Sequence, residues 1–466
     1  MPKSESKSTA DTLASAASAV PVKVRPRRRF LGGLRAGFKL AQTGWSIVGI
    51  SLLLLLAVDR GAKWLLERGS FQYSQKRLAD LQPEGDRAWI EAFVEERGDT
   101  EFTSSAVRWE PFAYWRSAEH RGQFFNVDAA GLRRTVNPAP PADAKAVQRV
   151  FLFGGSAMWG DSVRDEHTIP SLLAEQLHQH ADAVEVTNFA QLGYVSTQEW
   201  IALALELRRG NVPDLVVFFD GANDVGAAAA NYQPGVSINE VNRQLEFNLL
   251  NDASWGRLFK SCAYNSAIGR LVRGGRGPEW AERQRDEMVA RNDERIERHA
   301  AALQALPSTA TPQQRRQAEK DLRDLDIGRE AVAVYRANLR IVQALQKAAG
   351  FETLFFWQPT VLDRSQPSVE ETAIIGDNAK LQRIWNAAMR TWSEIQAAEA
   401  KAPPANPWPQ TILLGDVFDR PELAGKSMFF DLVHPSEVAN AIVAERMLPH
   451  VRAALDQRRA GQQSGQ

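Results

Sequence analysis

The most pronounced hydrophobic pattern is an uninterrupted apolar segment near the N-terminus, from Leu40 to Val58. Its 19 residues include no charged side chain, and a helix of this length, at about 1.5 Å per residue, crosses a hydrocarbon core of roughly 30 Å. The preceding residues 1–39 carry nine Lys and Arg residues against two acidic ones. We therefore expect a basic, disordered cytoplasmic tail over 1–39 and a transmembrane helix over 40–58. A cleavable signal peptide is disfavoured, because Val-Asp-Arg-Gly follows Ala57 where a small-residue cleavage site would stand.

Beyond residue 147 the pattern changes, and short apolar runs alternate with stretches of helical periodicity. The runs predict strands at Val147–Phe153, Val184–Asn188, Leu215–Phe219, Thr353–Trp357 and Thr411–Leu414. Helical periodicity covers 170–177, 197–208 and 437–455. This alternation predicts an α/β/α domain over 147–456, in which helices cover both faces of a five-stranded parallel sheet.

Three further segments complete the expected organisation. Residues 59–146 are rich in aromatic side chains and predict a juxtamembrane accessory region that packs on the main domain, with sugar binding as the alternative. A helical insert is expected at about 225–350. Its part 225–276 could form a lid, and its charged stretches 279–306 and 312–349 predict solvent-facing helices. Residues 457–466 are expected to be disordered.

Composition narrows the function. Lys+Arg and Asp+Glu balance at 56 each, which argues against a nucleic-acid-binding protein that works through a basic surface. The single cysteine, Cys262, excludes an internal disulfide and a cysteine-based zinc site, and its neighbours give it the character of an ordinary small apolar residue. No histidine has a partner at metal-ligand spacing, so we expect neither a metal nor an organic cofactor.

Polar residues and glycines follow the first three predicted strands at the points where a parallel sheet places reactive groups. Ser156 follows strand 147–153 after two glycines, Gly193 follows the second strand, and Asn223 follows the third within Asp-Gly-Ala-Asn-Asp. Near the C-terminus, Asp431 stands three residues before His434. Together the four clusters supply what a serine nucleophile needs, because the hydroxyl requires a base and the developing oxyanion requires hydrogen-bond donors.

In this order the four clusters resemble the signature blocks of the SGNH/GDSL hydrolase superfamily, from about Arg149 to the final helix. The resemblance implies a flavodoxin-like fold with Ser156 as the nucleophile, His434 as the general base and Asp431 as the group that holds it. It also implies an oxyanion hole formed by the N–H of Ser156, the N–H of Gly193 and the amide of Asn223.

The first block departs from the family pattern, because Gly155 stands where Gly-Asp-Ser has its aspartate. A literal Gly-Asp-Ser occurs at 160–162, which makes Ser162 the rival nucleophile. We favour Ser156 because it directly follows the strand. Four residues flank the expected site and are hypothetical substrate-pocket residues, with packing as the alternative: Trp159, Trp357, Gln358 and Phe429.

These features predict an extracytoplasmic serine esterase, tethered to a bacterial inner membrane by one helix with its catalytic domain in the periplasm. Its expected substrates are acyl esters, with O-acetyl groups of envelope or exported polysaccharide as the class that the location favours. Three other functions remain compatible with the motifs: an O-acyltransferase to a polysaccharide hydroxyl, a lipase or thioesterase, and a catalytically silent polysaccharide-binding or scaffold protein.

Overall fold

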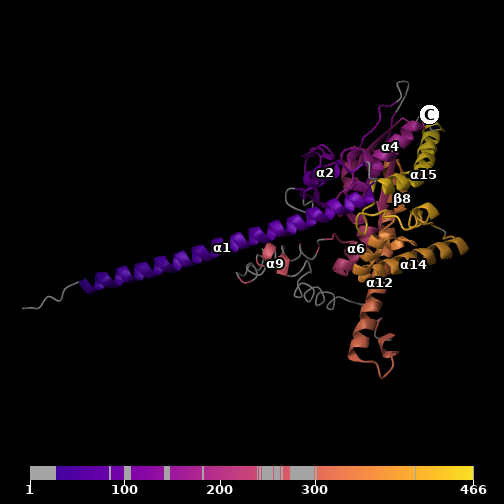
Figure 1. The fold of residues 1–466 in the computed structure, drawn as a ribbon. Helices are drawn as coiled ribbons and strands as arrows, with labels where there is room; N and C mark the ends of the chain where they lie inside the picture. The colour runs from indigo at the N-terminus through magenta and orange to yellow at the C-terminus, as the bar shows by residue number, and fades with distance from the viewer. Residues whose placement is uncertain are drawn as a thin grey trace, which may run out of the picture. The chain divides into compact units, whose positions relative to one another are not determined.

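The computed structural model describes residues 28–464 except 83–85, 99–105, 141–146, 181–182, 405 and most of 239–301. The chain divides into two compact units, residues 1–62 and residues 63–466. Figure 1 labels their elements.

The described part of the first unit is helical and belongs to helix α1, Arg28–Leu81. Its apolar side chains are exposed, with Leu52 to Leu56 showing 56 to 67% of their surface. The stretch Ala41–Leu81 is the one helix among the described residues that is long and apolar enough to cross a membrane. Residues 28–39, expected to be disordered, form the beginning of this helix.

A five-stranded parallel sheet forms the centre of the second unit. Its strands are β5 (Gln148–Gly154), β6 (Val184–Asn188), β7 (Leu215–Asp220), β8 (Glu352–Trp357) and β9 (Thr411–Leu413). They lie in the order β6-β5-β7-β8-β9, and every neighbouring pair is parallel. In order along the chain this is 2-1-3-4-5, the flavodoxin-like arrangement. The predicted α/β/α fold is therefore confirmed.

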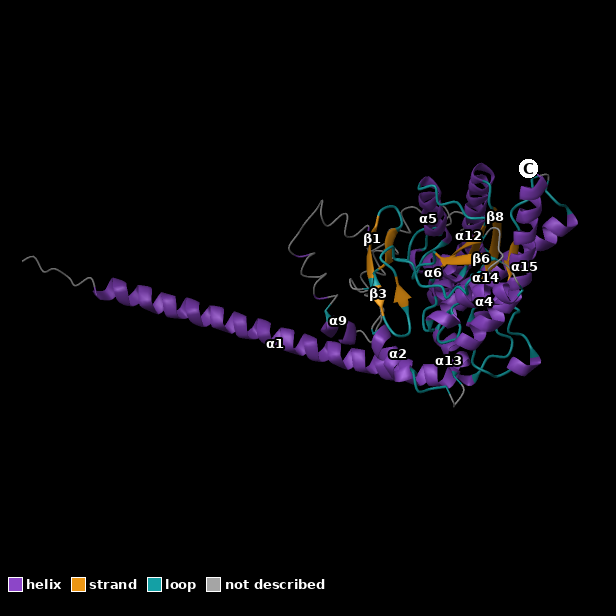
Figure 2. Cartoon of the chain, turned by 90° about the horizontal axis from the view of Figure 1, so that it is seen from above, coloured by secondary structure: helices purple, strands orange, loops and turns teal. Residues whose placement is uncertain are grey.

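Helices cover both faces of the sheet because alternate strand residues point to opposite sides. Leu152 and Val217 face a core built with α4 (Ile169–Gln179) and α15 (Glu437–Ser464). Phe153 and Phe218 face a second core. That core is closed by α5 (Ser196–Arg208), α6 (Ala222–Asn231), α12 (Pro312–Ala349) and α14 (Ala379–Lys401). Figure 2 shows the helices around the strands.

The shorter elements connect this framework. They are α3 (Ser156–Trp159), α9 (Ala267–Val272), α13 (Val369–Asp377) and three 3₁₀ turns, η1 (Asp165–His167), η2 (Val361–Asp363) and η3 (Pro421–Leu423).

Two further sequence expectations need correction. Residues 312–349 were expected to form a helix of the insert, and α12 has these bounds, but it is a crossover helix of the main fold. Its side chains at Ile327, Ala331, Tyr335 and Val342 are buried against the sheet. The charged residues occupy its outer face and hide this apolar stripe. The second correction concerns residues 457–466, because α15 continues through this segment as far as Ser464. Most of the expected lid, most of stretch 279–306 and Cys262 lie outside the described residues.

The accessory region is small and attached to the sheet's edge. It comprises α2 (Ile90–Arg97), the hairpin of β1 (Val107–Glu110) and β2 (Tyr114–Ser117), and the short pair β3 (His120–Arg121) and β4 (Asn126–Val127). Trp115 Nε1 donates to the Leu192 carbonyl at 2.7 Å, and Gln198 donates to the Ala113 carbonyl at 2.8 Å. These contacts bring the accessory region next to the loop that follows β6.

Candidate active site

Three of the sequence-predicted residues meet at the C-terminal edge of the sheet. Ser156 opens α3 directly after β5, Gly193 lies in the turn after β6, and Asn223 lies in the first turn of α6 after β7. Strand β5 lies between β6 and β7. The chain passes from β5 to β6 on one side and later returns to form β7 on the other side. This is the topological switch point at which α/β sheets form their crevice.

A line of two short hydrogen bonds joins Ser156, His434 and Asp431. Ser156 Oγ and His434 Nε2 are 2.6 Å apart, and His434 Nδ1 is 2.6 Å from Asp431 Oδ2. The other carboxylate oxygen, Oδ1, accepts the backbone N–H groups of Val433 and His434 at 2.9 and 3.0 Å. Asp431 therefore stabilises the turn that carries His434 and also orients the His434 ring. Nδ1–H donates to Asp431, and Nε2 faces the serine.

The same contacts set the charges of the pair. Burial alone would lower the pKa of His434, but the charge and hydrogen bond of Asp431 outweigh it and, with Asp161, raise this pKa to about 8. For Asp431, loss of water would raise the pKa, whereas the His434 charge and hydrogen bond and the backbone N–H groups lower it to about 2. With a pKa of about 8 the imidazole is mostly protonated at neutral pH, and it becomes able to accept a proton as the pH rises through this value, beside a carboxylate that stays ionised.

The three expected oxyanion donors lie in the turns that follow their strands. Asn223 Nδ2 donates to the Tyr194 carbonyl at 2.8 Å, and a Cβ placed on Gly155 would meet that same nitrogen at 2.1 Å. Gly193 adopts a φ of +69°, which a residue with a side chain rarely adopts. The N–H of Ser156 has no intrahelical acceptor, because Ser156 is the first residue of α3. The Asn223 amide therefore lies next to the residue that precedes the serine.

The histidine loop is anchored from two directions. The Arg77 guanidinium, on the last turns of α1, is buried and donates to the carbonyls of Phe429 and Phe430. The buried Glu371 accepts the N–H groups of Met428 and Phe429 at 2.7 and 3.1 Å. These two charged groups hold the backbone segment that leads to His434 and so help to fix the position of its ring.

The rival nucleophile lies elsewhere. Ser162 is buried, with 3% of its surface exposed, and has a φ of +69°. Its Oγ has no hydrogen-bond partner among the described residues. Hydrogen bonding to the histidine therefore distinguishes Ser156 from Ser162.

Sequence reasoning missed two charged residues beside His434. Asp161 Oδ2 lies 3.7 Å from His434 Nε2, and Arg97 of α2 binds both oxygens of Asp161 at 3.0 and 2.9 Å. Asp161 belongs to the literal Gly-Asp-Ser, which we set aside together with its serine. Arg97 carries no local signal, because it comes from the accessory region 64 residues earlier.

The four residues expected to line a substrate pocket are packing residues instead. Trp159, Trp357, Gln358 and Phe429 expose between 0 and 5% of their surface. Trp357 packs against Tyr335, Trp385 and Trp392, with ring centroids 5.1 to 5.8 Å apart. Trp159 and Phe429 pack into one core of the domain and Trp357, the last residue of β8, packs into the other.

A cluster of buried acids lies behind the site. Burial raises the pKa of Asp220, the last residue of β7, to about 8 and that of Asp224 to about 6. It raises the pKa of Glu199 on α5 well above its usual value, to which the charge of Asp220 adds. Asp224 Oδ1 also accepts from the Ser196 hydroxyl at 2.6 Å. The cluster sits under the turn that carries Asn223. No group of three or more side chains suited to a metal ion occurs among the described residues.

No family model matches this chain, and no curated protein does either. Among solved structures, the acetyl xylan esterase AlAXEase is 15% identical with a TM-score of 0.32, and covers 65% of this chain and 99% of its own. The esterase EstA from Pseudoalteromonas sp. is 11% identical with a TM-score of 0.30, covering 66% and 99%. TesA is 15% identical with a TM-score of 0.28, covering 67% and 99%. Likenesses this distant decide nothing about this chain's chemistry.

Proposed function

We propose that this chain is a serine esterase of the SGNH type, in which Ser156 attacks an ester carbonyl and forms an acyl-serine. One observation carries the proposal: Ser156 lies in a continuous hydrogen-bonded line with His434 and Asp431, which follow it in the sequence by 275 residues or more. The line lies at the C-terminal edge of the sheet, where Gly193 and Asn223 also follow their strands. A structural role would not require a short contact between a serine hydroxyl and an imidazole that is in turn paired with a carboxylate.

The steps follow from the geometry. His434 Nε2 takes the Ser156 proton as Oγ bonds to the ester carbon, and Asp431 stabilises the imidazolium that forms. The Ser156 N–H, the Gly193 N–H and the Asn223 amide would bind the oxyanion. His434 then donates its proton to the leaving alcohol, the acyl-serine remains, and water completes hydrolysis by the same route in reverse.

We further propose that the N-terminal helix over residues 40–58 anchors the enzyme in a bacterial inner membrane, with the tail 1–39 in the cytoplasm and the domain 147–456 in the periplasm. The asymmetric basic charge before the apolar segment supports this orientation. Outside the cytoplasm, O-acetyl esters of envelope or exported polysaccharide are the substrate class that fits. If a sugar hydroxyl instead of water accepts the acyl group, the same acyl-serine makes the protein an O-acyltransferase.

The test uses the full chain purified in detergent, with para-nitrophenyl esters of increasing chain length and with acetylated polysaccharide. Ester cleavage that disappears in Ser156→Ala and His434→Ala and persists in Ser162→Ala supports the proposal. A folded wild type that cleaves none of these esters and forms no acyl-serine contradicts it and favours a silent binding protein. Preference for long acyl chains would point to a lipase or thioesterase.

A further inference from the structure

The ring nitrogen of His434 that faces Ser156 has a second neighbour, the carboxylate of Asp161. Asp161 Oδ2 lies 3.7 Å from His434 Nε2, whereas Asp431 is on the opposite side of the ring at Nδ1. A distance of 3.7 Å is too long for a direct hydrogen bond. It is short enough for a molecule with two O–H groups to bridge Nε2 and Oδ2 by hydrogen bonds of about 2.8 Å.

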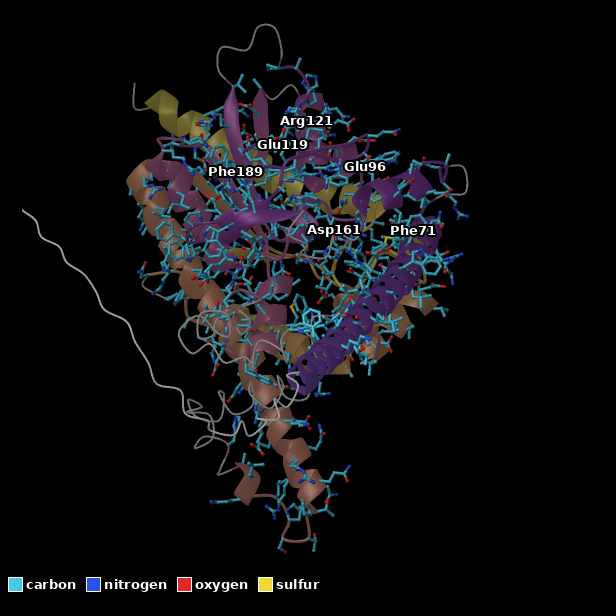
Figure 3. All side chains as sticks on the ribbon, turned by 90° about the vertical axis from the view of Figure 1, so that its left-hand side faces the viewer. Phe71, Glu96, Glu119, Arg121, Asp161 and Phe189 are labelled. Atoms are coloured by element: carbon cyan, nitrogen blue, oxygen red, sulfur yellow. The ribbon has the colours of Figure 1, made fainter. Side chains whose placement is uncertain are left out.

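Asp161 is held firmly in this place. Arg97 binds its two oxygens in a bidentate pair, and the N–H of Ser162 donates to Oδ1 at 3.0 Å. The Arg97 guanidinium also lies over the ring of Phe430, with 5.5 Å between its carbon and the ring centroid. Figure 3 labels Asp161, and also Glu96, the neighbour of Arg97 on α2. Glu96 accepts N–H groups from the segment Gln123–Phe125 and so fixes α2 against the domain.

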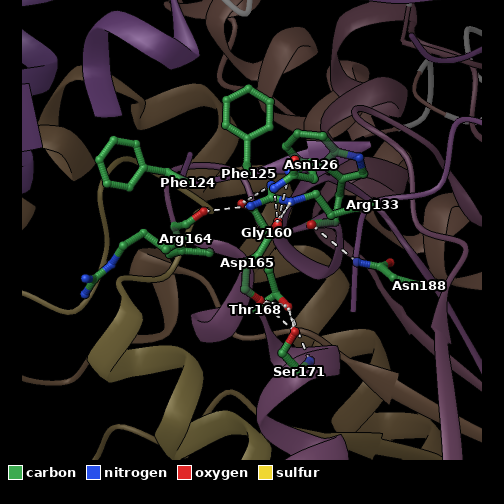
Figure 4. Close-up of polar contacts among 12 residues, drawn as sticks. Phe124, Phe125, Asn126, Arg133, Gly160, Arg164, Asp165, Thr168, Ser171 and Asn188 are labelled. Atoms are coloured by element: carbon green, nitrogen blue, oxygen red, sulfur yellow. Dashed lines mark hydrogen bonds and ion pairs between the residues drawn. The ribbon is translucent and has the colours of Figure 1, made fainter. Parts of the chain in front are cut away.

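The loop that carries Asp161 is fixed from below by a buried arginine. Arg133 donates to the Gly160 carbonyl at 3.0 Å and to Asp165 at 2.7 Å, as Figure 4 shows. It also donates to the Val163 carbonyl at 2.9 Å. These carbonyls flank Asp161 on both sides. The loop is therefore rigid at its base, while the side chains of Asp161 and His434 keep 12 and 14% of their surface exposed. Both can be reached by a molecule from solvent.

We propose that Asp161, held by Arg97, binds the second nucleophile of the reaction, and that this nucleophile offers two O–H bonds at once, as water or a vicinal diol does. One O–H donates to His434 Nε2 and the other to Asp161 Oδ2. The proposal rests on the acyl-serine chemistry above and deepens it. The Ser156 hydroxyl hydrogen-bonds to Nε2, so Asp161 affects the first step only through the pKa of His434 and positions a reactant only when the serine is already acylated.

The second step then balances as follows. The incoming oxygen bonds to the acyl carbon, its O–H bond breaks, and the proton passes to His434 Nε2. The bond between the acyl carbon and Ser156 Oγ breaks, and Oγ takes the proton from His434. The second O–H stays intact and keeps its hydrogen bond to Asp161, so the carboxylate positions the nucleophile and receives no proton.

The test compares wild type, Asp161→Asn and a matched carboxylate control, Asp86→Asn, in the full-length protein. Asp86 lies on the surface and pairs with Arg164 rather than with His434. The substrate is para-nitrophenyl acetate at pH 9, where His434 is neutral, and two quantities are followed: the rate of the first p-nitrophenol release, and the acyl-serine fraction by intact mass after acid quench. We expect Asp161→Asn to leave acylation within about twofold and to slow deacylation by about 10- to 100-fold, the usual effect of losing a hydrogen bond to a charged group. The acyl-serine then accumulates.

Two further readouts separate positioning from a structural effect. With 1,2-ethanediol or ethanol added, wild type should transfer the acetyl group preferentially to the diol over the monohydric alcohol, and Asp161→Asn should lose this preference. If only the water reaction slows and no diol preference exists, the second nucleophile is water alone. The groups facing His434 are Asp431, Asp161 and Arg97, of which Asp161 raises its pKa and Arg97 lowers it. The acid limb of the pH–rate profile should therefore move to lower pH in Asp161→Asn and to higher pH in Arg97→Gln.

Equal acylation and deacylation in Asp161→Asn and wild type would overturn the role of Asp161, and so would an equal slowing of both steps. A wild type that releases no p-nitrophenol and forms no acyl-serine would instead overturn the proposed function, and the role of Asp161 with it. The two failures are thus distinguished by p-nitrophenol release from the wild type.

Discussion

Adding a single methyl group at Gly155 should disable the site without disturbing the fold. Gly155 has φ −81° and ψ −157°, which alanine adopts without strain. A Cβ there would lie 2.1 Å from Asn223 Nδ2, far inside van der Waals contact, and 3.4 Å from the Tyr194 carbonyl oxygen. The Asn223 side chain must therefore move, and it loses its 2.8 Å hydrogen bond to that carbonyl.

The expected magnitude is that of one oxyanion donor, about 3 kcal/mol or a 10²- to 10³-fold loss of kcat. Steady-state cleavage of para-nitrophenyl acetate measures it, and thermal unfolding serves as the control for the fold. If Gly155→Ala acts only by displacing the amide, then Gly155→Ala, Asn223→Ala and the double variant should lose equal activity. Wild-type activity in Gly155→Ala, or full additivity in the double variant, would refute the assignment of Asn223 as a donor.

Three more predictions follow from the charged groups. Because His434 must be neutral to accept the serine proton, kcat/KM should rise with pH up to a pKa of about 8. Asp431→Asn should move this rise to lower pH. A pH-independent kcat/KM would exclude His434 as the base. The buried acids Glu199 and Asp220 keep their protons in the folded state, whereas in the unfolded chain they lose them above about pH 4. The unfolding free energy should therefore fall between about pH 4 and about pH 8. Chemical denaturation at several pH values should show a weaker fall for Glu199→Gln. Arg77→Ala leaves the carbonyls of Phe429 and Phe430 without their charged donor, which should lower the unfolding free energy by about 2–3 kcal/mol. It should also reduce kcat more than it changes KM. An unchanged denaturation midpoint would contradict the anchoring role of Arg77.

The sheet could be read from the sequence because each strand is a short apolar run bounded by polar residues. The segment Val184–Asn188 matches β6 at both ends, and β5 and β7 begin or end within one residue of expectation. The flavodoxin-like arrangement was implied by the resemblance. The helix over 312–349 was also predicted, but its packing on the sheet was not, because its apolar stripe is narrow and lies among many charges.

The proposed nucleophile, base and carboxylate could be located for a similar reason, since each lies in a short motif with a chemical requirement. Residues that act across long sequence separations could not. Arg97 reaches Asp161 from the accessory region, and Arg77 holds a loop 352 residues later. The four aromatic and amide residues near the motifs were placed in a pocket from sequence proximity, whereas the direction of a side chain from a strand or turn decides its burial. Proximity along the chain is a weak guide to which atoms line a site.

The central claim is that Ser156 is a nucleophile activated by His434, and covalent labelling tests it most directly. The full-length protein is treated with a fluorophosphonate, digested with trypsin and sequenced by mass spectrometry; residues 150–164 form one peptide that contains both Ser156 and Ser162. We expect an adduct on Ser156 that is retained in Ser162→Ala and strongly reduced in His434→Ala. An adduct on Ser162, or equal labelling of Ser156 with and without His434, would contradict it.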